Sequence, residues 1–472
     1  MKAELHLYER VARRIAGLIE ARTLRPGEKI PSVRQCSRAE SVSLSTVLQA
    51  YFLLEDRGLI ESRPQSGFYV RLDPGRLPPP PDLSIPPLTA TEVGVSDLIF
   101  RIQDAIASPD IVPLGGAVPA EELLPVRKLN RAMASVARRS RGAEHSYGSV
   151  SGIESLRHQI ARRSVDAGCS FSSEDLIVTF GCMEAVQLCL RAVASAGDII
   201  AVESPTYYAF FQMLETLKMR ALEIPTDPVT GIRLESLETA IRKHRIKACL
   251  VVSNFNNPLG SCIPESRKKA LVDLLGKKGI PLIEDDIYGE LYFGHRRPGV
   301  CKAFDRRGLV LLCSSFSKVL SPAYRVGWTA PGRFYREVQR LKFTSTYATA
   351  IPTQMAIAEL IRSGGYDHHL RRIRKTYSGQ VQSMIQAVAK YFPEGTRITR
   401  PQGGFVVWVQ LPRGIDAMKL YEKALAERIS IVPGHIFSAR PLYRNFIRLN
   451  CSHPWSDRIE QSVFLLGRLA GN

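Results

Sequence analysis

The chain has 472 residues and a formal net charge of +19, so we expect more than one domain and a polyanionic partner. It contains no run of about 18 apolar residues and begins without the apolar core of a signal peptide, which argues against a membrane protein and predicts a cytoplasmic location. The nine cysteines are scattered without a C-x-x-C pair, which argues against a disulfide framework or a zinc site.

The first 72 residues predict three short helices and a hairpin. The expected elements are helices over 5–22, over 32–39 with Pro31 in its first turn, and from the cap Ser43 to Gly58, then strands at 59–60 and 68–70. Such a winged helix-turn-helix places its third helix in the major groove of DNA. These residues hold 12 basic against 8 acidic side chains, a net charge of only +4, so the motif and not the charge supports DNA binding.

This segment resembles the GntR family of bacterial regulators. The resemblance rests on Pro31–Arg34, Val42–Tyr51, Leu54–Leu59 and the wing Arg63–Phe68. It implies contacts with double-stranded operator DNA from Arg34, Ser43, Leu44, Ser45, Thr46, Arg63 and Gly67. Leu44 stands where many members have an arginine, so one base or phosphate contact is missing or replaced.

Residues 73–95 contain seven prolines, which neither a helix nor an inner strand accommodates. We interpret them as a semi-rigid polyproline linker. The domain boundaries are therefore predicted at 1–72, 73–95 and 96–472.

Short apolar runs alternate with helical stretches in the remainder of the chain. The clearest runs are 176–179, 199–202, 248–252, 281–283 and 309–312. This alternation predicts an α/β domain with a largely parallel or mixed sheet covered by helices. From about Thr349 the pattern is more helical until the runs 405–409 and 446–449, which predicts a smaller α+β lobe.

The stretch from Leu311 to Trp328 carries the strongest chemical signal. An apolar run ends in serines, Lys318 follows, and Arg325 lies seven positions further on. A desolvated lysine beside another cation loses proton affinity and can form a Schiff base with an aldehyde. Serine hydroxyls and an arginine suit a phosphate dianion, so the pattern indicates pyridoxal phosphate. The alternatives are a surface lysine and a serine hydrolase of the S-x-x-K type, for which neither S-D-N nor K-T-G follows.

Polar residues follow four other apolar runs. Gly181–Met183 begin a helix whose N–H groups can bind a phosphate. Tyr207 offers a ring for stacking, the stretch Asn254–Gly260 offers an amide donor, and Asp285 or Asp286 offers a carboxylate to a pyridinium nitrogen. The sequence leaves open which aspartate points inward. Each feature singly is also ordinary turn chemistry.

From residue 96 to 472 the chain resembles the fold-type I aminotransferases. The matching motifs are Tyr147–Gly148–x–x–x–Gly152, Gly181–Cys182–Met183, Tyr207, Asn257–Pro258, Asp285–x–x–Tyr288, Ser315–x–x–Lys318, Arg325 and Arg448. The departures are small, and one is Ala323 in place of a common glycine.

The resemblance implies a role for each of these residues. Lys318 forms the internal aldimine, Asp285 holds the ring nitrogen, and Tyr207 stacks on the ring. The phenolate is bound by Asn257 and Tyr288, and the phosphate by Gly181, Cys182, Met183, Ser315 and Arg325. Tyr147 reaches the phosphate of the partner subunit, which implies a homodimer. Arg448 binds the α-carboxylate of an amino compound under a loop that contains Gly115 and Gly116.

The order of a GntR-like head, a proline-rich linker and an aminotransferase-like body resembles the MocR group of bacterial regulators over the whole chain. It implies a transcriptional regulator that controls promoter binding through pyridoxal phosphate and an amino compound bound to it as an external aldimine. Two interpretations stay open: an aminotransferase with an accessory DNA-binding head, because the catalytic set is intact, and a sensor of pyridoxal phosphate alone. The effector, an amino acid or an amine, and the operator are not identifiable from the sequence.

Three further features need an interpretation. Cys182 lies at a predicted helix start, where a thiol can become reactive, but we expect it to be inert beneath a phosphate. Arg371–Lys375 is interpreted as a solvated basic helix face and not as a second DNA contact. The pair His368–His369 has no other ligands nearby in the sequence, so no metal site is expected.

Overall fold

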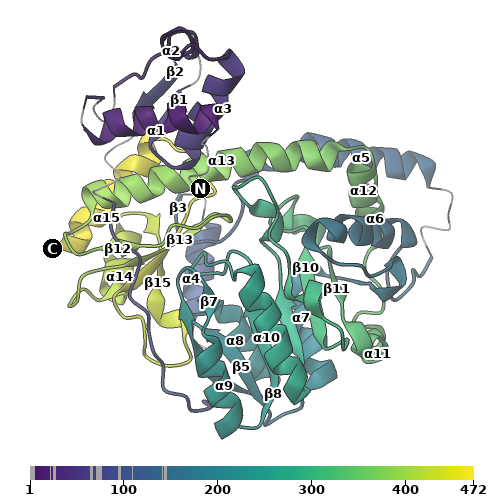
Figure 1. Ribbon diagram of the computed structural model, residues 1–472. Coiled ribbons are helices and arrows are strands. Elements are labelled where there is room, and N and C mark those ends of the chain that lie inside the picture. Colours follow the sequence, from purple (N-terminus) through teal and green to yellow (C-terminus); the bar gives the residue numbers. More distant parts are fainter. Residues whose placement is uncertain are drawn as a thin grey trace. The chain divides into compact units, whose positions relative to one another are not determined.

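The computed structural model describes residues 6–21, 23–24, 28–63, 67–70, 77–93, 97–108, 110–140, 142 and 146–471 (Figure 1). The chain divides into two compact units, Met1–Pro78 and Pro79–Asn472. In the described residues no helix is long and apolar enough to cross a membrane.

The first unit consists of three helices and a hairpin. Its elements are α1 (Leu7–Glu20), α2 (Val33–Glu40), α3 (Leu44–Asp56), β1 (Ile60–Arg63) and β2 (Gly67–Val70). Ser32 and Ser43 cap α2 and α3 by accepting hydrogen bonds from the N–H groups of Gln35 and Thr46. We had predicted Pro31 in the first turn of this helix, but it precedes the cap of α2. Its carbonyl accepts a hydrogen bond of 2.6 Å from the Tyr51 hydroxyl.

The two strands form the predicted antiparallel wing, with Ile60 opposite Val70 and Arg63 opposite Gly67. The predicted turn at 64–66 and the side chain of Arg63 lie outside the described residues, as do the ends of the first predicted helix at Leu5 and Arg22. Apolar side chains from all three helices and both strands make one core.

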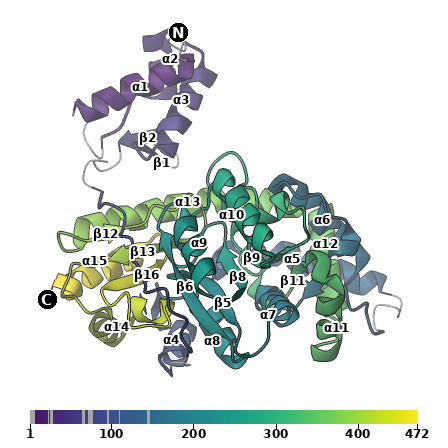
Figure 2. The same cartoon turned by 60° about the horizontal axis from the view of Figure 1, so that its bottom comes forward.

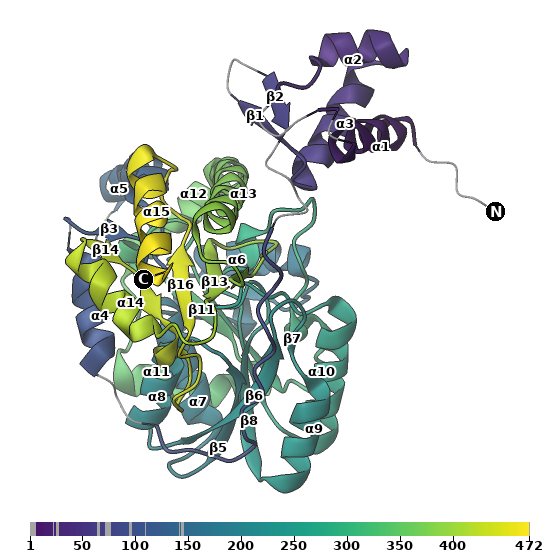
Figure 3. The same cartoon turned by 90° about the vertical axis from the view of Figure 1, so that its left-hand side faces the viewer.

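Part of the predicted linker lies on the surface of the second unit. We call residues 79–93 the strap; its course is visible in Figure 3. The Pro79 carbonyl accepts from Ile398 at 3.0 Å, and Asp82 pairs with Arg397 at 3.1 Å. Further along, Thr91 forms a bridge with Ala221. The strap therefore contacts both the small lobe and the main sheet. Composition did not predict these contacts. Residues 71–76 and 94–96 of the linker region lie outside the described residues.

The main sheet of the second unit has eight strands in the order β4-β11-β10-β9-β8-β5-β6-β7. The strands are β4 (Ile177–Thr179), β5 (Ile199–Ser204), β6 (Arg220–Asp227), β7 (Gly231–Ile232), β8 (Ile246–Val252), β9 (Leu282–Asp285), β10 (Val310–Ser315) and β11 (Gly327–Ala330). β10, β9, β8, β5 and β6 are parallel neighbours, whereas β11 runs antiparallel between β10 and β4. This mixed sheet confirms the predicted fold class. β6, β7 and β11 were not predicted.

Helices cover both faces of this sheet (Figure 2). α7 (Gly181–Val193) and α8 (Tyr208–Thr216) pack on one face, and α9 (Leu234–Lys243) and α10 (Glu265–Lys278) on the other. Strands covered on both faces are uniformly apolar, as in the Ala248–Val252 run of β8. The polar residues that follow the parallel strands therefore gather at one edge.

The other α-helices and β-strands of the second unit include those of the small lobe. They are α4 (Asp97–Ala107), β3 (Val112–Pro113), α5 (Val126–Arg139), α6 (Glu154–Ser164), α11 (Tyr335–Ser345), α12 (Ile351–Arg362), α13 (Gly365–Tyr391), β12 (Arg397–Ile398), β13 (Val406–Gln410), α14 (Ala417–Ala426), β14 (Ile429–Ser430), β15 (Val432–Pro433), β16 (Phe446–Asn450) and α15 (Asp457–Gly471). A second sheet has the order β12-β13-β16-β15.

Arg371, Arg372 and Lys375 of the basic run on α13 are exposed, as predicted for a solvated face, but the run also makes contacts that we had not predicted. Arg372 donates to the Leu123 carbonyl at 2.7 Å, and Arg374 donates to the backbone and side chain of Glu290. Both arginines bind loops of the second unit because α13 lies against those loops along its N-terminal half.

Candidate functional site

A cavity of about 200 Å³ lies at the edge of the main sheet where the parallel strands end. Ten of the predicted site residues line it: Gly116, Cys182, Met183, Tyr207, Asn257, Asp285, Tyr288, Ser315, Lys318 and Arg325. They come from five different strand ends and from the loop after β3. The convergence follows from the parallel topology, which places the carboxyl ends of neighbouring strands side by side.

Lys318 follows β10 in a compact turn and reaches into this cavity. Its Nζ donates a hydrogen bond of 2.6 Å to the carbonyl of Ala117. Burial lowers the pKa of Lys318 to about 8, and the nearby cations Arg448 and Arg325 act in the same direction against the opposing carboxylate of Asp285. An amine with this pKa is partly unprotonated near neutral pH, which is the form that attacks a carbonyl.

Of the two adjacent aspartates, Asp285 lines the cavity and Asp286 does not. Asp285 accepts hydrogen bonds from the Cys182 thiol at 3.3 Å and from the backbone N–H of Ile287 at 2.9 Å. The Asp286 carboxylate accepts hydrogen bonds from the side chains of Asn254 and Arg297. Burial raises the pKa of Asp285 to about 7, so a cationic partner is needed to hold this carboxyl ionised.

The start of α7 and Arg325 together form a site suited to an anion. The first N–H groups of a helix have no partner within the helix and carry positive dipole. Gly181 begins α7 with φ +80°, and a Cβ there would come within 2.7 Å of Arg325 Nη2. Arg325 donates to the Phe180 carbonyl at 3.2 Å, and Ser315 is buried beside it in the lining. A side chain at 181 would strain the backbone at this φ and would require the guanidinium to shift from its observed position.

The pKa of Cys182 is raised, not lowered. Burial is the largest cause, and the neighbouring Asp285 carboxylate acts in the same direction. The thiol is therefore held protonated as a donor to Asp285, in agreement with the expectation that it is inert.

Arg448 on β16 is fully buried next to the cavity. Its Nη1 donates to the Asn257 side-chain oxygen at 3.0 Å, and its Nη2 donates to the Gly115 carbonyl. In the described part of the chain Nε has no partner, and the groups that favour its charge are tyrosine hydroxyls and not a carboxylate. Burial lowers the pKa of Arg448. A buried guanidinium without an acidic partner suits a ligand carboxylate.

Three aromatic side chains shape the cavity wall. The Tyr207 ring lies 4.7 Å from that of Tyr208, and the buried Tyr288 lies 5.7 Å from Phe405. Tyr208 and Gln103 of α4 line the cavity and hydrogen-bond to each other, although neither was predicted. Tyr208 could have been predicted because it directly follows Tyr207 in the sequence. Nothing in the sequence around Gln103 indicates that it lies near the strand ends.

Tyr147 does not line this cavity. It is 90% exposed, and its ring lies 5.2 Å from that of Tyr347. Within the described residues no three His, Cys, Asp or Glu side chains gather as a metal-binding group. Of the pair considered for metal binding, His369 is buried and hydrogen-bonded to the Val319 carbonyl.

In the first unit, Ser43, Leu44, Ser45 and Thr46 of the predicted DNA-contacting residues form the cap and first turn of α3, whereas Arg34 lies on α2. Arg34, Ser43, Leu44 and Ser45 are exposed, with Leu44 49% accessible, and Thr46 is half-buried. The Ser43 hydroxyl accepts from the Thr46 N–H, so part of its bonding capacity serves the helix cap. Gly67 is exposed in β2 with φ +109°.

Two family models match the chain. The model described as "Aminotransferase class I and II" matches residues 113–461, and the model described as "Bacterial regulatory proteins, gntR family" matches residues 7–70. The chain is 38% identical over 463 residues to an uncharacterized HTH-type transcriptional regulator, YdcR of Escherichia coli, covering 98% of both chains. It belongs to the HTH-type transcriptional regulators that carry a class I and II aminotransferase domain.

The second unit is also similar to enzymes of that aminotransferase family. Aromatic-amino-acid aminotransferase 1 of Thermococcus litoralis is 30% identical over 77% of this chain and 89% of its own. The structure of Pyrococcus horikoshii kynurenine aminotransferase matches with a TM-score of 0.75 and 29% identity, covering 80% of this chain and 95% of that one.

The family's cofactor is pyridoxal phosphate, and the regulator's cavity fits it. The anion site at Gly181 and Arg325 would suit a phosphate, because glycine at 181 leaves space for the guanidinium beside the helix start. The raised pKa of Asp285 calls for a cationic ring nitrogen, and the lowered pKa of Lys318 provides a reactive amine. The residues that would hold the cofactor therefore match it group by group.

Proposed function

We propose that this protein is a MocR-type transcriptional regulator whose DNA affinity is set by pyridoxal phosphate and an amino compound bound in the cavity. The observation that carries the proposal is the pairing of Lys318, whose amine has a lowered pKa, with Arg448, a fully buried guanidinium that has no acidic partner among the described residues. Together they present a site for an amine and for a carboxylate a short distance apart, on a chain that also carries a DNA-binding head.

Each group of the cofactor has a candidate partner. Pyridoxal phosphate, when bound, supplies an aldehyde for amines and an electron-withdrawing ring. The Lys318 amine would face the aldehyde, Asp285 would accept a hydrogen bond from the protonated ring nitrogen, and Tyr207 would pack against the ring. The phosphate would be held by Gly181, Cys182, Met183, Ser315 and Arg325, and the phenolate by Asn257 and Tyr288. Asn257 suits this role because its oxygen already accepts from Arg448, which leaves its amide as a donor.

Arg448 and the loop at Gly115–Gly116 define the effector class. A carboxylate that displaces the Gly115 carbonyl from Arg448 gains two charge-assisted hydrogen bonds in a dry site. We therefore favour an α-amino acid as the effector, with a carboxylate-free amine or pyridoxal phosphate alone as the alternatives.

The DNA contacts are assigned to residues 1–72. Arg34 and the exposed first turn of α3 suit the phosphates and base edges of a major groove. Leu44, which replaces an arginine common in the GntR family, has a large exposed apolar surface that suits a thymine methyl group. Arg63 and Gly67 belong to the wing. We assign residues 73–95 to the connection, of which 79–93 form the strap, and residues 96–472 to ligand binding.

The exposure of Tyr147 supports a homodimer. A tyrosine that is 90% exposed and does not line its own cavity is available to the phosphate of a second subunit. A regulator of DNA acts in the compartment that holds the chromosome, so we place it in the bacterial cytoplasm.

A catalytically active aminotransferase is the second candidate. The lysine, aspartate and arginine set around the cavity is complete, and the chain is 30% identical to an aminotransferase. The DNA-binding head distinguishes the two, since transamination does not need a wing and a recognition helix.

The proposal is tested by measuring how tightly the protein binds promoter DNA, which is first identified by chromatin immunoprecipitation in the native organism. Fluorescence anisotropy should show at least about a fivefold difference in promoter affinity between protein loaded with pyridoxal phosphate and stripped protein, the lower end of usual coupling energies. Lys318→Ala should lose this difference. Equal affinities in both wild-type states, or transamination without promoter binding, would favour the enzyme.

A further inference from the structure

The turn that carries Lys318 is built around one carbonyl group. The Phe316 carbonyl accepts from the N–H groups of Val319, Leu320 and Ser321 at 3.3, 2.8 and 3.3 Å. The carbonyl of Val319, the residue after the lysine, is directed to α13 instead. The turn therefore depends on α13 for part of its hydrogen bonding.

His369 of α13 supplies that hydrogen bond. Its Nε2 lies 2.7 Å from the Val319 carbonyl oxygen, and the side chain is only 2% exposed. Because the acceptor is a carbonyl, Nε2 must carry a proton and donate. In the described part of the chain Nδ1 has no partner.

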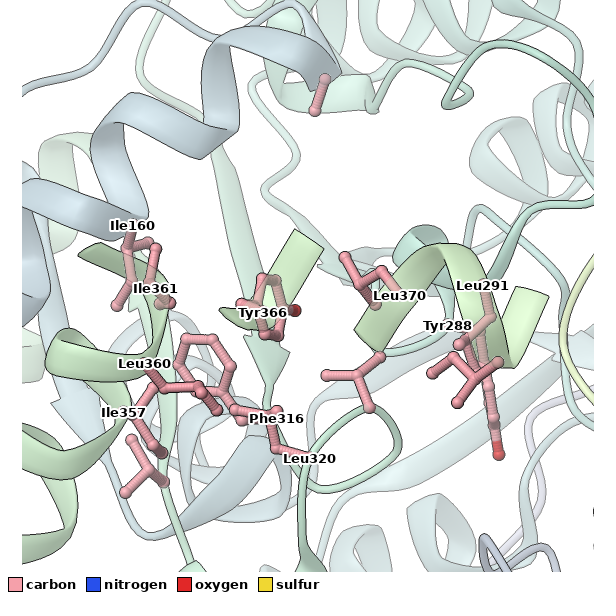
Figure 4. Packing of buried hydrophobic residues seen from close by; sticks show 14 of the residues in the cluster. Ile160, Tyr288, Leu291, Phe316, Leu320, Ile357, Leu360, Ile361, Tyr366 and Leu370 are labelled. Carbon is pink, nitrogen blue, oxygen red and sulfur yellow. The ribbon is translucent and has the colours of Figure 1, made fainter. Parts of the chain in front are cut away.

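Two apolar contacts flank this hydrogen bond on the same face of α13. The Tyr366 ring lies edge-on to Phe316, with centroids 6.1 Å apart. Figure 4 shows Tyr366 and Leu370 directed from α13 toward the turn, where Phe316 and Leu320 meet them. Residues 366, 369 and 370 follow the i, i+3, i+4 spacing of one helix face.

The ring is neutral under ordinary conditions. Burial lowers the pKa of His369 to about 4, and the charged groups that face it, Arg372 and His368 on α13 and Lys128 on α5, act in the same direction. The hydrogen bond to the Val319 carbonyl acts in the opposite direction and has more effect than any one of these charges, but burial outweighs it. His369 therefore acts as a fixed hydrogen-bond donor and not as a proton switch.

The same helix also binds two loops that continue from residues lining the cavity. Arg374 donates to the backbone carbonyl of Glu290, just after Tyr288, and Arg372 donates to the carbonyl of Leu123, in the loop that begins with Ala117. Toward its other end α13 packs on α15 and β13 of the small lobe. α13 therefore contacts the small lobe, the lysine turn and these two loops.

We propose that His369 is a positioning residue for Lys318: its hydrogen bond to the Val319 carbonyl fixes the lysine turn to α13 and keeps the lysine nitrogen desolvated. The inference rests on the proposed function of the cavity. It predicts that loss of the donor at 369 loosens the turn, admits water to the nitrogen, and raises the pH at which that nitrogen loses its proton, because hydration favours the charged form.

The experiment is a pH titration of the visible absorption band in protein loaded with pyridoxal phosphate. His369→Met, which removes the donor at similar length, should raise the spectral midpoint by about half a pH unit or more. His369→Gln, whose amide can still donate, should stay near wild type. His368→Met is the matched control, because His368 is exposed and contacts Lys128 instead of the turn. Melting temperatures of the stripped proteins report folding separately.

If His369→Met does not fold, His369→Asn serves in its place, since its amide is too short to reach the carbonyl. A folded donor-free variant with an unshifted midpoint overturns the inference, and so does an equal shift in the Gln variant. Failure of the proposed function is recognised independently, because wild-type protein would then show no visible band with pyridoxal phosphate.

Discussion

Replacing Arg448 by alanine is expected to abolish the response to amino acids while leaving the cofactor bound. The guanidinium is fully buried, donates to Asn257 and Gly115, and lies 5.3 Å above the ring of Phe437. Within the described residues, its hydrogen bonds do not involve Gly181 or Arg325. The substitution therefore removes the partner of an incoming carboxylate without touching the groups assigned to the phosphate.

The size of the loss follows from the burial of the pair. Truncating one partner of a buried, hydrogen-bonded charge pair costs about 2–5 kcal/mol, which is about 30- to 5,000-fold in affinity. Asn257 also loses its partner, so cofactor affinity is expected to fall by no more than about tenfold, the value of roughly one net hydrogen bond.

The assay titrates cofactor-loaded protein with a panel of L-amino acids, each paired with its decarboxylated amine, and follows the visible spectrum. Wild type should prefer one or more amino acids over the matching amines, and Arg448→Ala should erase that preference. Arg444→Ala is the control, because Arg444 lies on the same segment but pairs with Asp416 at the surface. An unchanged preference in Arg448→Ala would refute the role of Arg448 and leave an amine or pyridoxal phosphate as the signal.

Four further outcomes are expected. Borohydride reduction followed by peptide mapping should place a pyridoxyl group on Lys318, and a label on another lysine would contradict the assignment. Burial raises the pKa of Asp285 to about 7, so the cofactor-free fold is more stable at low pH and loses that stability, on the order of a few kcal/mol, between about pH 4 and 7. Asp285→Asn should therefore melt at a higher temperature than stripped wild type above pH 7. An equal or lower melting temperature would count against a buried acid. Arg34→Ala should weaken promoter binding and reduce its salt dependence, whereas an unchanged gel shift would exclude Arg34 from the groove. Arg397→Ala, which breaks the ion pair with Asp82 on the strap, should reduce the effect of ligand on DNA affinity without altering the visible spectrum, and a normal response would remove the strap from the coupling.

The site was largely predictable because a parallel sheet brings its strand ends to one edge. Lys318 and Asn257 each follow an apolar run, and the topology alone brings them together. The choice between Asp285 and Asp286 was not predictable, because the composition of a strand does not reveal which face meets the cavity. The structure separates them by their partners, Cys182 for the first and Arg297 for the second.

Features that depend on distant packing had no local signal. Gln103 lies on α4, well before any cavity strand, and His369 acts through a turn fifty residues away. The strap was interpreted from its prolines alone, whereas its hydrogen bonds involve β6, β12 and β13. Cys182 illustrates competing effects: a helix start lowers a thiol pKa, but burial and the Asp285 carboxylate outweigh it and raise that pKa.

The most direct measurement of the coupling between cavity and DNA is a closed thermodynamic cycle. Promoter affinity is measured by anisotropy with and without the amino compound that changes the visible spectrum, and the affinity of that compound is measured with and without saturating promoter DNA. Because linkage is reciprocal, we expect the two ratios to be equal and to differ from one by about fivefold or more. Ratios of one in both directions would contradict a regulator controlled through this cavity.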